Sequence, residues 1–343
     1  MNRSDWSFNL PADRIAQEPT RRRGDSRLLV LGKTNGKIRH TRIRCLPEIL
    51  QAGDLLVVND TAVIPGRLLG RRLTGGKVEV LLLESQFAPG GGDPVRRQRW
   101  TCLVRPSRKL GSGERIRFGD SLEGVLGTRQ GEIWRIDLES PKALRGVISS
   151  VGRTPLPPYI RREPGDPREE RDRRRYQTIY AGRPGSAAAP TAGLHFTRGI
   201  LDRLKRDGIG RAPLTLHLGA ASFVPARPCR PAQQGQLKSV SLPPERFRLP
   251  IATARAIREV KSRGGRVIAV GTSTTRVLES CHERKSGVRP GEGTCRLFIR
   301  PGHKFRVVDG ILTNFHLPGS THLLLVGALA GKQSILEAYR QGI

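Results

Sequence analysis

The sequence predicts an α/β protein into which an all-β module is inserted. Three observations indicate this class: an apolar strand, DLLVVND, ends at Asp60; short apolar runs separated by glycine-rich turns follow it; and helices alternate with strands from Tyr176 onward. Alternation of helix and strand is typical of a parallel sheet with helices packed on it. We therefore expect an α/β unit and an inserted β unit, which are residues 1–65 plus 153–343 and residues 66–152.

Within the inserted unit, the apolar runs VEVLLLE, WTCLVRP, RIRFG and IWRIDLE predict short strands, as is typical of an all-β module. GGGD near Gly91 predicts a flexible hairpin tip. The proline-rich PLPPYIRR after the module predicts a rigid bridge. The charged REPGDPREERDRRR that follows predicts an exposed loop or a frayed helix.

The second half carries clear start and stop signals. Thr197 can cap a helix that Gly208 ends, and two glycines after Arg263 end a second helix. The expected elements are, in order, a helix over 198–207, the strand APLTLHLG, a helix over 251–263 and the strand RVIAVG, after which TSTTR opens another helix.

Composition limits the function. The 343 residues carry 61 Lys+Arg against 30 Asp+Glu, a formal charge of +31, which favours a polyanionic partner such as nucleic acid, although compositional drift also produces such a charge. No apolar run approaches the roughly 20 residues that span a bilayer, and the amino-terminal segment lacks the apolar core of a signal peptide. The five cysteines are scattered and form no C-x-x-C pair. We expect a cytoplasmic protein without a membrane partner, a zinc site or a disulfide framework.

GTSTTR, residues 271–276, directly follows a predicted strand and opens a helix. A hydroxyl-rich loop in this place can bind an anion or a nucleotide, because free backbone N–H groups and the helix dipole point at the ligand. The alternative is that Thr272 or Ser273 only caps the helix. The chain has no Walker lysine here and no G-x-G-x-x-G after a strand, so neither ATP hydrolysis nor a Rossmann dinucleotide site is indicated.

Three histidines stand at the ends of predicted elements. His195 lies in PTAGLHFT, His217 near the end of LTLHLGAASF, and His316 in NFHLPGST, before a helix capped by Ser320. Ligands of open α/β sheets bind at such ends. A structural role for each histidine is the alternative. Their spacing is not that of a compact metal site, so no metal is predicted.

Two further segments can carry chemistry. VRPSRK ends a strand of the β module, where Arg105 and Arg108 can bind phosphate or carboxylate, or can simply be solvated. Asp60 in VVNDT can be a catalytic acid or base, or an Asx-turn residue.

Taken together, these blocks resemble one family. DLLVVNDTAVIPGRL, LVRPSRKL, PLPPYIRR, GSAAAPTAGLHFT, LTLHLGAASF, RVIAVGTSTTRVLES and VVDGILTNFHLPGST are similar in kind and order to the S-adenosylmethionine:tRNA ribosyltransferase-isomerases of queuosine biosynthesis. The resemblance runs from Trp6 to about Arg340. It implies a barrel-like α/β catalytic domain with an inserted antiparallel β-barrel domain. It also implies transfer and isomerisation of the ribosyl moiety of S-adenosylmethionine onto 7-aminomethyl-7-deazaguanine at the wobble position of tRNAs with GUN anticodons. The product is epoxyqueuosine, with adenine and methionine released.

The resemblance also suggests roles for residues. We expect S-adenosylmethionine to be consumed as a substrate, with no cofactor, and the protein to act as a monomer. General acid–base work suits histidine, whose pKa lies near working pH. The candidate catalytic residues are His195, His217, His316 and Asp60; the candidate substrate-binding residues are Thr191, Thr272, Ser273, Thr274, Arg276 and Asn314; the candidate tRNA-binding residues are Arg105, Arg108 and Lys109.

The chain departs from the family pattern in places. QLKSVSLPPERF, residues 236–247, replaces a Met-His-x-Glu-like segment, so that only Glu245 can substitute there. Ala221 and Gly319 replace a glycine and a lysine. The resemblance therefore leaves open an alternative, a catalytically weakened relative that acts as a tRNA-binding protein.

Overall fold

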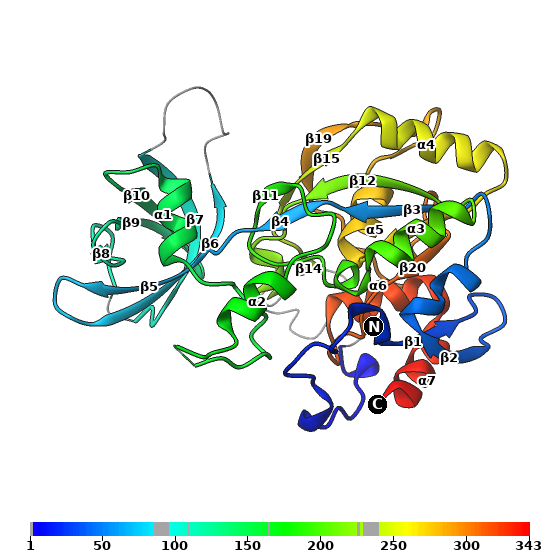
Figure 1. Ribbon diagram of the computed structural model, residues 1–343, viewed down its shortest axis with the longest axis horizontal. Helices are drawn as coiled ribbons and strands as arrows, with labels where there is room; N and C mark the ends of the chain where they lie inside the picture. Colours follow the sequence, from blue (N-terminus) through cyan, green and yellow to red (C-terminus); the bar gives the residue numbers. More distant parts are fainter. Residues whose placement is uncertain (1–2, 86–95, 109, 164, 225–226, 229–239) are drawn as a thin grey trace.

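The computed structural model contains two bodies, a closed β-barrel and a larger sheet covered by helices (Figure 1). It describes residues 3–85, 96–108, 110–163, 165–224, 227–228 and 240–343. The expected α/β class and the inserted antiparallel barrel are confirmed. Two earlier expectations, the hairpin tip near Gly91 and the role of Lys109, lie outside the described residues.

The barrel closes in the strand order β10-β7-β6-β5-β8-β9, and every neighbouring pair is antiparallel. Alternation along the strands explains its core: in β10, Trp134, Ile136 and Leu138 are buried while the residues between them face outward. The strands are β5 Arg67–Arg72, β6 Lys77–Ser85, β7 Arg97–Arg105, β8 Arg115–Arg117, β9 Glu123–Gln130 and β10 Ile133–Glu139.

A helix, α1 Leu144–Val151, follows the last barrel strand and packs on the barrel core. The expectation of an all-β module therefore missed this helix. The chain enters and leaves the barrel side by side, because Arg67 and Arg153 exchange two backbone hydrogen bonds of 3.1 and 2.9 Å. A Cβ on Gly152 would lie 1.8 Å from the Pro65 carbonyl oxygen, so this crossing requires glycine.

The larger sheet has the strand order β19-β15-β12-β3-β16-β20. The four strands from β12 to β20 are parallel, and β15 and β19 add antiparallel strands at one side, which the predicted parallel sheet did not include. The bounds are β3 Leu55–Asn59, β12 Gly210–Leu216, β15 Glu245–Leu249, β16 Val267–Val270, β19 Gly291–Cys295 and β20 Gly310–Leu312.

Helices cover both faces of this sheet. In β3, Leu55 and Val57 pack with α4 and α5 on one face, whereas Leu56 and Val58 pack with α3 on the other. A strand buried on both faces reads as a continuous apolar run, which is what LLVV is. The helices are α2 Glu169–Arg175, α3 Arg198–Arg206, α4 Ile251–Ser262, α5 Thr272–Ser280, α6 Thr321–Ala330 and α7 Lys332–Gly342.

The predicted helix starts are confirmed. The side chain of Thr197 accepts a hydrogen bond from the Ile200 N–H at 3.2 Å, and Ser320 accepts one from Leu323 at 3.2 Å. The charged stretch after the proline-rich bridge contains α2, which agrees with the helical alternative. Short 3₁₀ helices complete the body: η1 Arg3–Trp6, η2 Ala12–Arg14, η3 Arg23–Asp25, η4 Ile43–Glu48, η5 Thr191–His195 and η6 Ala220–Ser222.

The remaining strands pair in twos. They are β1 Arg27–Leu31 with β2 Ile38–Arg42, β4 Thr61–Val63 with β11 Arg183–Ser186, β13 Arg227–Pro228 with β14 Val240–Ser241, and β17 His282–Glu283 with β18 Gly287–Val288. No helix of the described ranges is both long and apolar enough to cross a membrane.

Candidate active site at the carboxyl edge of the sheet

Polar residues follow each of the four parallel strands where it ends. Asp60 follows β3 and His217 follows β12; Thr272 comes after β16 and Asn314 after β20. Carboxyl ends of parallel strands share one edge of a sheet, and ligands of open α/β sheets bind there. In Figure 1 this edge faces the barrel, with β4 between them. The structure therefore brings four segments, far apart in the sequence, to one edge.

His217 has one ring nitrogen held and one open. Its Nδ1 lies 2.8 Å from Thr61 Oγ1, whereas its Nε2 has no partner among the described residues. The ring packs against the backbone of Gly185, where a Cβ would lie 3.0 Å from the ring and where φ is +145°. Glycine at 185 therefore makes room for this imidazole.

Charged residues around His217 shift its pKa in opposite directions. Burial lowers the pKa of His217 below its usual value, Asp60 opposes this, and Arg246 and Arg183 add to the lowering. Asp60 itself accepts a hydrogen bond of 2.6 Å from Thr215 Oγ1 and lies 3.6 Å from Arg183 Nε. The ring is therefore neutral at neutral pH, and its open nitrogen can accept a proton.

His195 differs from His217, because both of its ring nitrogens are engaged. Nδ1 lies 3.0 Å from Ser26 Oγ, and Nε2 lies 3.1 Å from Asn314 Nδ2. Arg23 donates a hydrogen bond of 2.9 Å to the carbonyl oxygen of Leu194, which fixes the same turn. Burial lowers the pKa of His195. In this arrangement His195 holds its neighbours and has no nitrogen free for a substrate.

His316 is half-buried beside a second histidine. Its Nε2 lies 3.2 Å from Thr313 Oγ1, and its backbone N–H donates to the Tyr339 hydroxyl at 2.9 Å. The ring stacks on His322 with 5.1 Å between centroids. Burial lowers the pKa of His316 well below its usual value and that of His322 to about 4. Both rings are neutral at neutral pH, and they stiffen the loop that carries Asn314.

The amino end of α5 has no side-chain cap. Gly271 precedes the helix with φ +93°, and no side chain of the described ranges accepts a hydrogen bond from the first turn. Thr274 Oγ1 donates to the Val270 carbonyl oxygen at 2.8 Å, whereas the described contacts give no partner to the hydroxyls of Thr272 and Ser273. The alternative in which Thr272 or Ser273 only caps the helix is therefore wrong. The first N–H groups of α5 and two hydroxyls stay available to a ligand.

Arg276, on the second turn of α5, is engaged within the protein. Its Nη1 donates to Glu245 Oε2 at 2.6 Å and its Nε to the Leu297 carbonyl oxygen at 2.9 Å. The two side chains of the ion pair are 5% and 1% exposed. Glu245 Oε1 accepts from the Gly219 N–H at 3.2 Å, so the pair ties α5 and β15 to the segment after His217.

A small cavity lies beside this ion pair, under the amino end of α6. It measures about 10 Å³, which is room for about one water molecule. Its lining includes Arg276, Ala221, Thr321 and His322. Ala221, one position at which the sequence departs from the family pattern, therefore lines the same cavity as Arg276, which pairs with Glu245 of the altered 236–247 segment.

The candidate tRNA-binding residues lie elsewhere. Arg105 ends β7 in the barrel, and Arg108 follows it in the next turn. Thr191 opens η5, in the same turn as His195. The structure thus brings the candidate catalytic and substrate-binding residues to the sheet edge or to elements that line it, and it puts the arginines of VRPSRK in the other body.

Several residues that contact the candidate site were not predicted. Ser26, Thr61 and Gly185 touch the histidines, and Tyr180 packs its hydroxyl against Gly193, where a Cβ would lie 2.3 Å away. None belongs to a motif with a recognisable chemical spacing. Only Gly193 gave a signal, because it stands between apolar residues just before His195.

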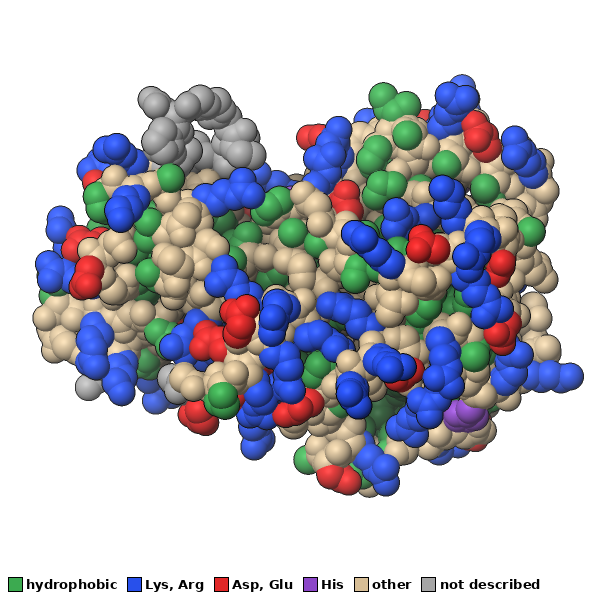
Figure 2. Space-filling model, in the orientation of Figure 1, with side chains coloured by type: hydrophobic (Ala, Val, Ile, Leu, Met, Phe, Trp, Pro, Cys, Tyr) green, Lys and Arg blue, Asp and Glu red, His purple; other side chains and the backbone are tan. Residues whose placement is uncertain are grey.

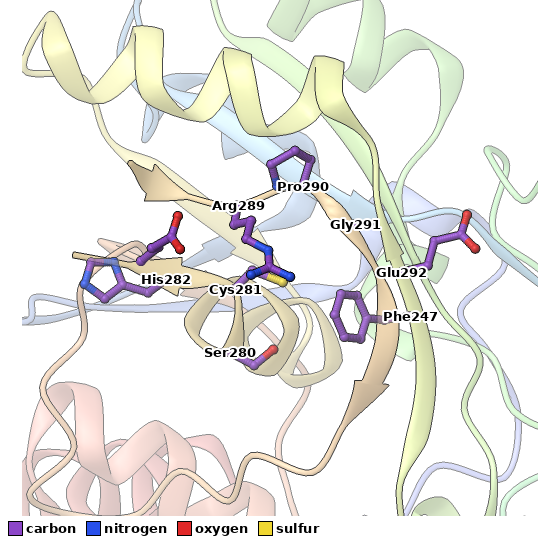
Figure 3. A pocket seen from close by; sticks show the side chains of 9 residues that line it. Phe247, Ser280, Cys281, His282, Arg289, Pro290, Gly291 and Glu292 are labelled. Carbon is purple, nitrogen blue, oxygen red and sulfur yellow. The ribbon is translucent and has the colours of Figure 1, made fainter. Parts of the chain in front are cut away.

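A larger hollow of about 330 Å³ lies at the other end of α5, under α4 (Figure 3). The side chain of Arg289 points into it opposite the ring of Phe247. Burial raises the pKa of the Cys281 thiol in its wall to about 11, so this thiol is protonated at neutral pH. The hollow is lined by the last residues of α5 and not by those that open it, so it is separate from the candidate site.

Figure 2 shows Lys and Arg side chains over both bodies, with Asp and Glu between them. On the barrel the acids pair with arginines across strands, as in Arg99–Asp137 at 2.6 Å and Arg97–Glu139 at 2.6 Å. Within the described part of the chain, no group of three or more His, Cys, Asp or Glu side chains can hold a metal ion.

Comparisons with known proteins agree with this fold. The model of a family described as queuosine biosynthesis protein matches residues 3–343. The chain is 42% identical to the S-adenosylmethionine:tRNA ribosyltransferase-isomerase of Geotalea uraniireducens, over 100% of this chain and 95% of that protein. It is 44% identical to the protein of the same name from Anaeromyxobacter dehalogenans, with the same coverage.

Among solved structures, the S-adenosylmethionine tRNA ribosyltransferase of Thermotoga maritima matches with a TM-score of 0.52 and 31% identity, over 99% of this chain and 94% of that chain. The family match covers both bodies of the structure, the barrel and the helix-covered sheet. The chain therefore belongs to the queuosine biosynthesis protein family.

Proposed function

We propose that this chain is an S-adenosylmethionine:tRNA ribosyltransferase-isomerase. It transfers and isomerises the ribosyl moiety of S-adenosylmethionine onto 7-aminomethyl-7-deazaguanine at the tRNA wobble position, giving epoxyqueuosine-tRNA, adenine and methionine. Full-length relatives of that name support this activity. The observation that carries it in the structure is the convergence of polar residues from four strand ends at one edge of the sheet.

The reaction demands proton transfers that this edge can supply. The sulfonium acidifies the neighbouring ribose carbon, so a general base must remove a proton there, and adenine leaves more readily when it is protonated. His217 fits the base, because its ring is neutral and Nε2 is open. Asp60 stabilises the imidazolium that forms, since its charge raises the pKa of His217. Asp60 is also a second candidate base.

In this proposal the other two histidines position neighbouring groups and do not transfer protons. His195 has both ring nitrogens engaged, and the ring of His316 stacks on that of His322. Each therefore supports the loop around Asn314. This assignment differs from the expectation that any of the three histidines could relay protons, and it rests on which ring nitrogens have partners.

The amino end of α5 binds the donor in this proposal. Its uncapped N–H groups and the hydroxyls of Thr272 and Ser273 suit the methionine carboxylate or the ribose hydroxyls. Thr274 contributes through its backbone, since its hydroxyl already donates to Val270. Thr191 lies in the turn that carries His195, and Arg276 acts through Glu245 on the shape of the site rather than as a carboxylate clamp.

The barrel, residues 66–152, is an inserted domain between residues 1–65 and 153–343 of the catalytic domain. The side-by-side entry and exit of the chain at Arg67 and Arg153 supports this division. The charge of +31 suits the tRNA backbone. Arg105 and Arg108, together with Lys109, contact tRNA phosphates, while the wobble base is splayed out of its loop to reach the sheet edge.

The finer expectations complete the proposal. The tRNA carries a GUN anticodon, the enzyme acts as a cytoplasmic monomer, and S-adenosylmethionine is a substrate with no added cofactor.

Release of free adenine tests the proposal. The protein is incubated with S-adenosylmethionine and tRNA that bears 7-aminomethyl-7-deazaguanine, and adenine and methionine are quantified. We expect both products in equal amounts, and only with the modified tRNA. Binding of tRNA without adenine release would instead identify a non-catalytic RNA-binding protein, and S-adenosylhomocysteine as product would identify a methyltransferase.

A further inference from the structure

Asn314 has an unusual combination of contacts. Its Nδ2 lies 3.1 Å from His195 Nε2, but its Oδ1 is buried and has no hydrogen-bond partner in the described part of the chain. The residue as a whole is only partly buried, at the edge of the sheet where β20 ends. A buried acceptor without a partner loses its hydrogen bonds to water and gains none from the protein. Its burial therefore costs free energy and needs an explanation.

A chain of hydrogen bonds leads from this carboxamide to the amino-terminal segment. His195 Nδ1 lies 3.0 Å from Ser26 Oγ, Ser26 Oγ lies 3.3 Å from Thr20 Oγ1, and the Thr20 hydroxyl donates to the Arg22 carbonyl oxygen at 2.9 Å. The Thr20 hydroxyl donates its hydrogen bond to a carbonyl oxygen, so it accepts one from the Ser26 hydroxyl. Ser26 Oγ in turn accepts a hydrogen bond from His195 Nδ1–H, and His195 Nε2 accepts one from Asn314 Nδ2. One set of proton positions satisfies every link.

The segment that starts this chain is itself anchored. The carbonyl oxygen of Ser26 accepts a hydrogen bond of 3.0 Å from the Ile43 N–H. η3, just before it, packs on α3, since a Cβ on Gly24 would lie 3.1 Å from Ile200 Cδ1. Arg23 also binds the turn of η5 through Leu194. Ser26 is thus held in place before any ligand arrives.

We propose that Ser26 and His195 are positioning residues that turn the carboxamide of Asn314, so that its Oδ1 accepts a hydrogen bond from an amino group of S-adenosylmethionine. This inference rests on the proposed function, which supplies the ligand. An amide oxygen only accepts, so its partner is an N–H or O–H donor. S-adenosylmethionine offers two amino groups, the exocyclic amine of adenine and the ammonium of its methionine part. Both are N–H donors, which is what an acceptor such as Oδ1 requires.

The tautomer of His195 tests the geometry without any turnover. With ¹⁵N-labelled protein, two-bond ¹⁵N–¹H correlations of the imidazole distinguish a proton on Nδ1 from one on Nε2. We expect Nδ1–H in the wild type and a mixture in Ser26→Ala, while Ser26→Thr restores Nδ1–H. A proton on Nε2 in the wild type would reverse Asn314, leaving its Nδ2 open instead, and would overturn the proposal.

Donor binding tests the role of Oδ1. By calorimetry without tRNA, we expect Asn314→Leu to weaken S-adenosylmethionine binding about tenfold or more, as for a lost buried hydrogen bond. Ser26→Ala loses only the orientation, so we expect a roughly threefold effect that Ser26→Thr reverses. Ser262→Ala is the matched control, because its hydroxyl bonds within α4, to the Glu259 carbonyl oxygen, and should leave the affinity unchanged.

A second ligand identifies the amino group. 5′-Methylthioadenosine keeps the adenine amine and lacks the ammonium. Equal weakening of both ligands by Asn314→Leu assigns Oδ1 to the adenine amine, and weakening of S-adenosylmethionine alone assigns it to the ammonium. Unchanged affinity for both ligands in the folded variant overturns the inference while wild-type adenine release still supports the proposed function. A wild type that neither binds the donor nor releases adenine overturns both.

Discussion

The barrel and the carboxyl edge of the sheet use their polar side chains differently. On the barrel, charged side chains pair across neighbouring strands, as Arg99 does with Asp137, and the apolar side chains between them fill one core. At the sheet edge, His217 Nε2 and Asn314 Oδ1 have no partners among the described residues. The barrel also leaves two buried donors without partners, Trp100 Nε1 and Trp134 Nε1, but both belong to its apolar core. Unpartnered polar atoms cost stability, and at the sheet edge they come from separate strand ends that meet, which indicates where the molecule works.

The largest expected effect comes from replacing His217, whose Nε2 has no partner among the described residues. His217→Gln keeps a polar side chain but removes the base, so we expect adenine release to fall by about 10²–10⁴-fold. The rate is measured with saturating donor and modified tRNA, and thermal unfolding checks the fold. His40→Gln is the control, because His40 is an exposed residue of β2. Turnover of His217→Gln within threefold of wild type would contradict the proposed base.

A smaller loss is expected when the room for that imidazole is filled. In Gly185→Ala the new Cβ meets the His217 ring at 3.0 Å, and alanine is strained at φ +145°. We expect roughly tenfold slower adenine release with a loss of about 1 kcal/mol in unfolding free energy. Gly182→Ala, where a Cβ would meet nothing within 4 Å, should leave both unchanged. Equal effects of the two variants would show that contact with the ring does not matter.

A still smaller effect is expected on the pH dependence of adenine release. His217 must be neutral to accept a proton, so the rate should rise with pH through its pKa, which lies below the usual histidine value. Arg246 lowers this pKa, and Arg246→Gln therefore raises it. We expect the acidic limb of the kcat/KM profile to move to higher pH, and only slightly, because solvent screens the charge. A downward shift would place the titrating group elsewhere.

The smallest effect is expected on the barrel. Arg99→Ala removes one exposed cross-strand pair, so we expect almost no loss in unfolding free energy and no change in donor affinity. Denaturant unfolding and calorimetry measure the two quantities. Weaker donor binding in this variant would break the division between a barrel that does not bind the donor and an edge that does.

Local rules explain most of what the sequence predicted. The caps at Thr197 and Ser320, and the strand before GTSTTR, depend on neighbouring residues, and the structure has them. The predicted strand ends also located the candidate site, because the carboxyl ends of parallel strands lie at one edge of the sheet. The contacts of Ser26 with His195 and of Glu245 with Arg276 join residues distant in the sequence, and no spacing reveals them. Which histidine keeps an open nitrogen follows only from such contacts.

One measurement tests the convergence at the sheet edge most directly. The seven histidines are followed by NMR while S-adenosylmethionine is added. His217 and His195 should shift together with a single dissociation constant, because both belong to the edge that receives the donor. The exposed His40 and His282 should not move. Saturating donor that leaves His217 and His195 unshifted would contradict a shared donor site.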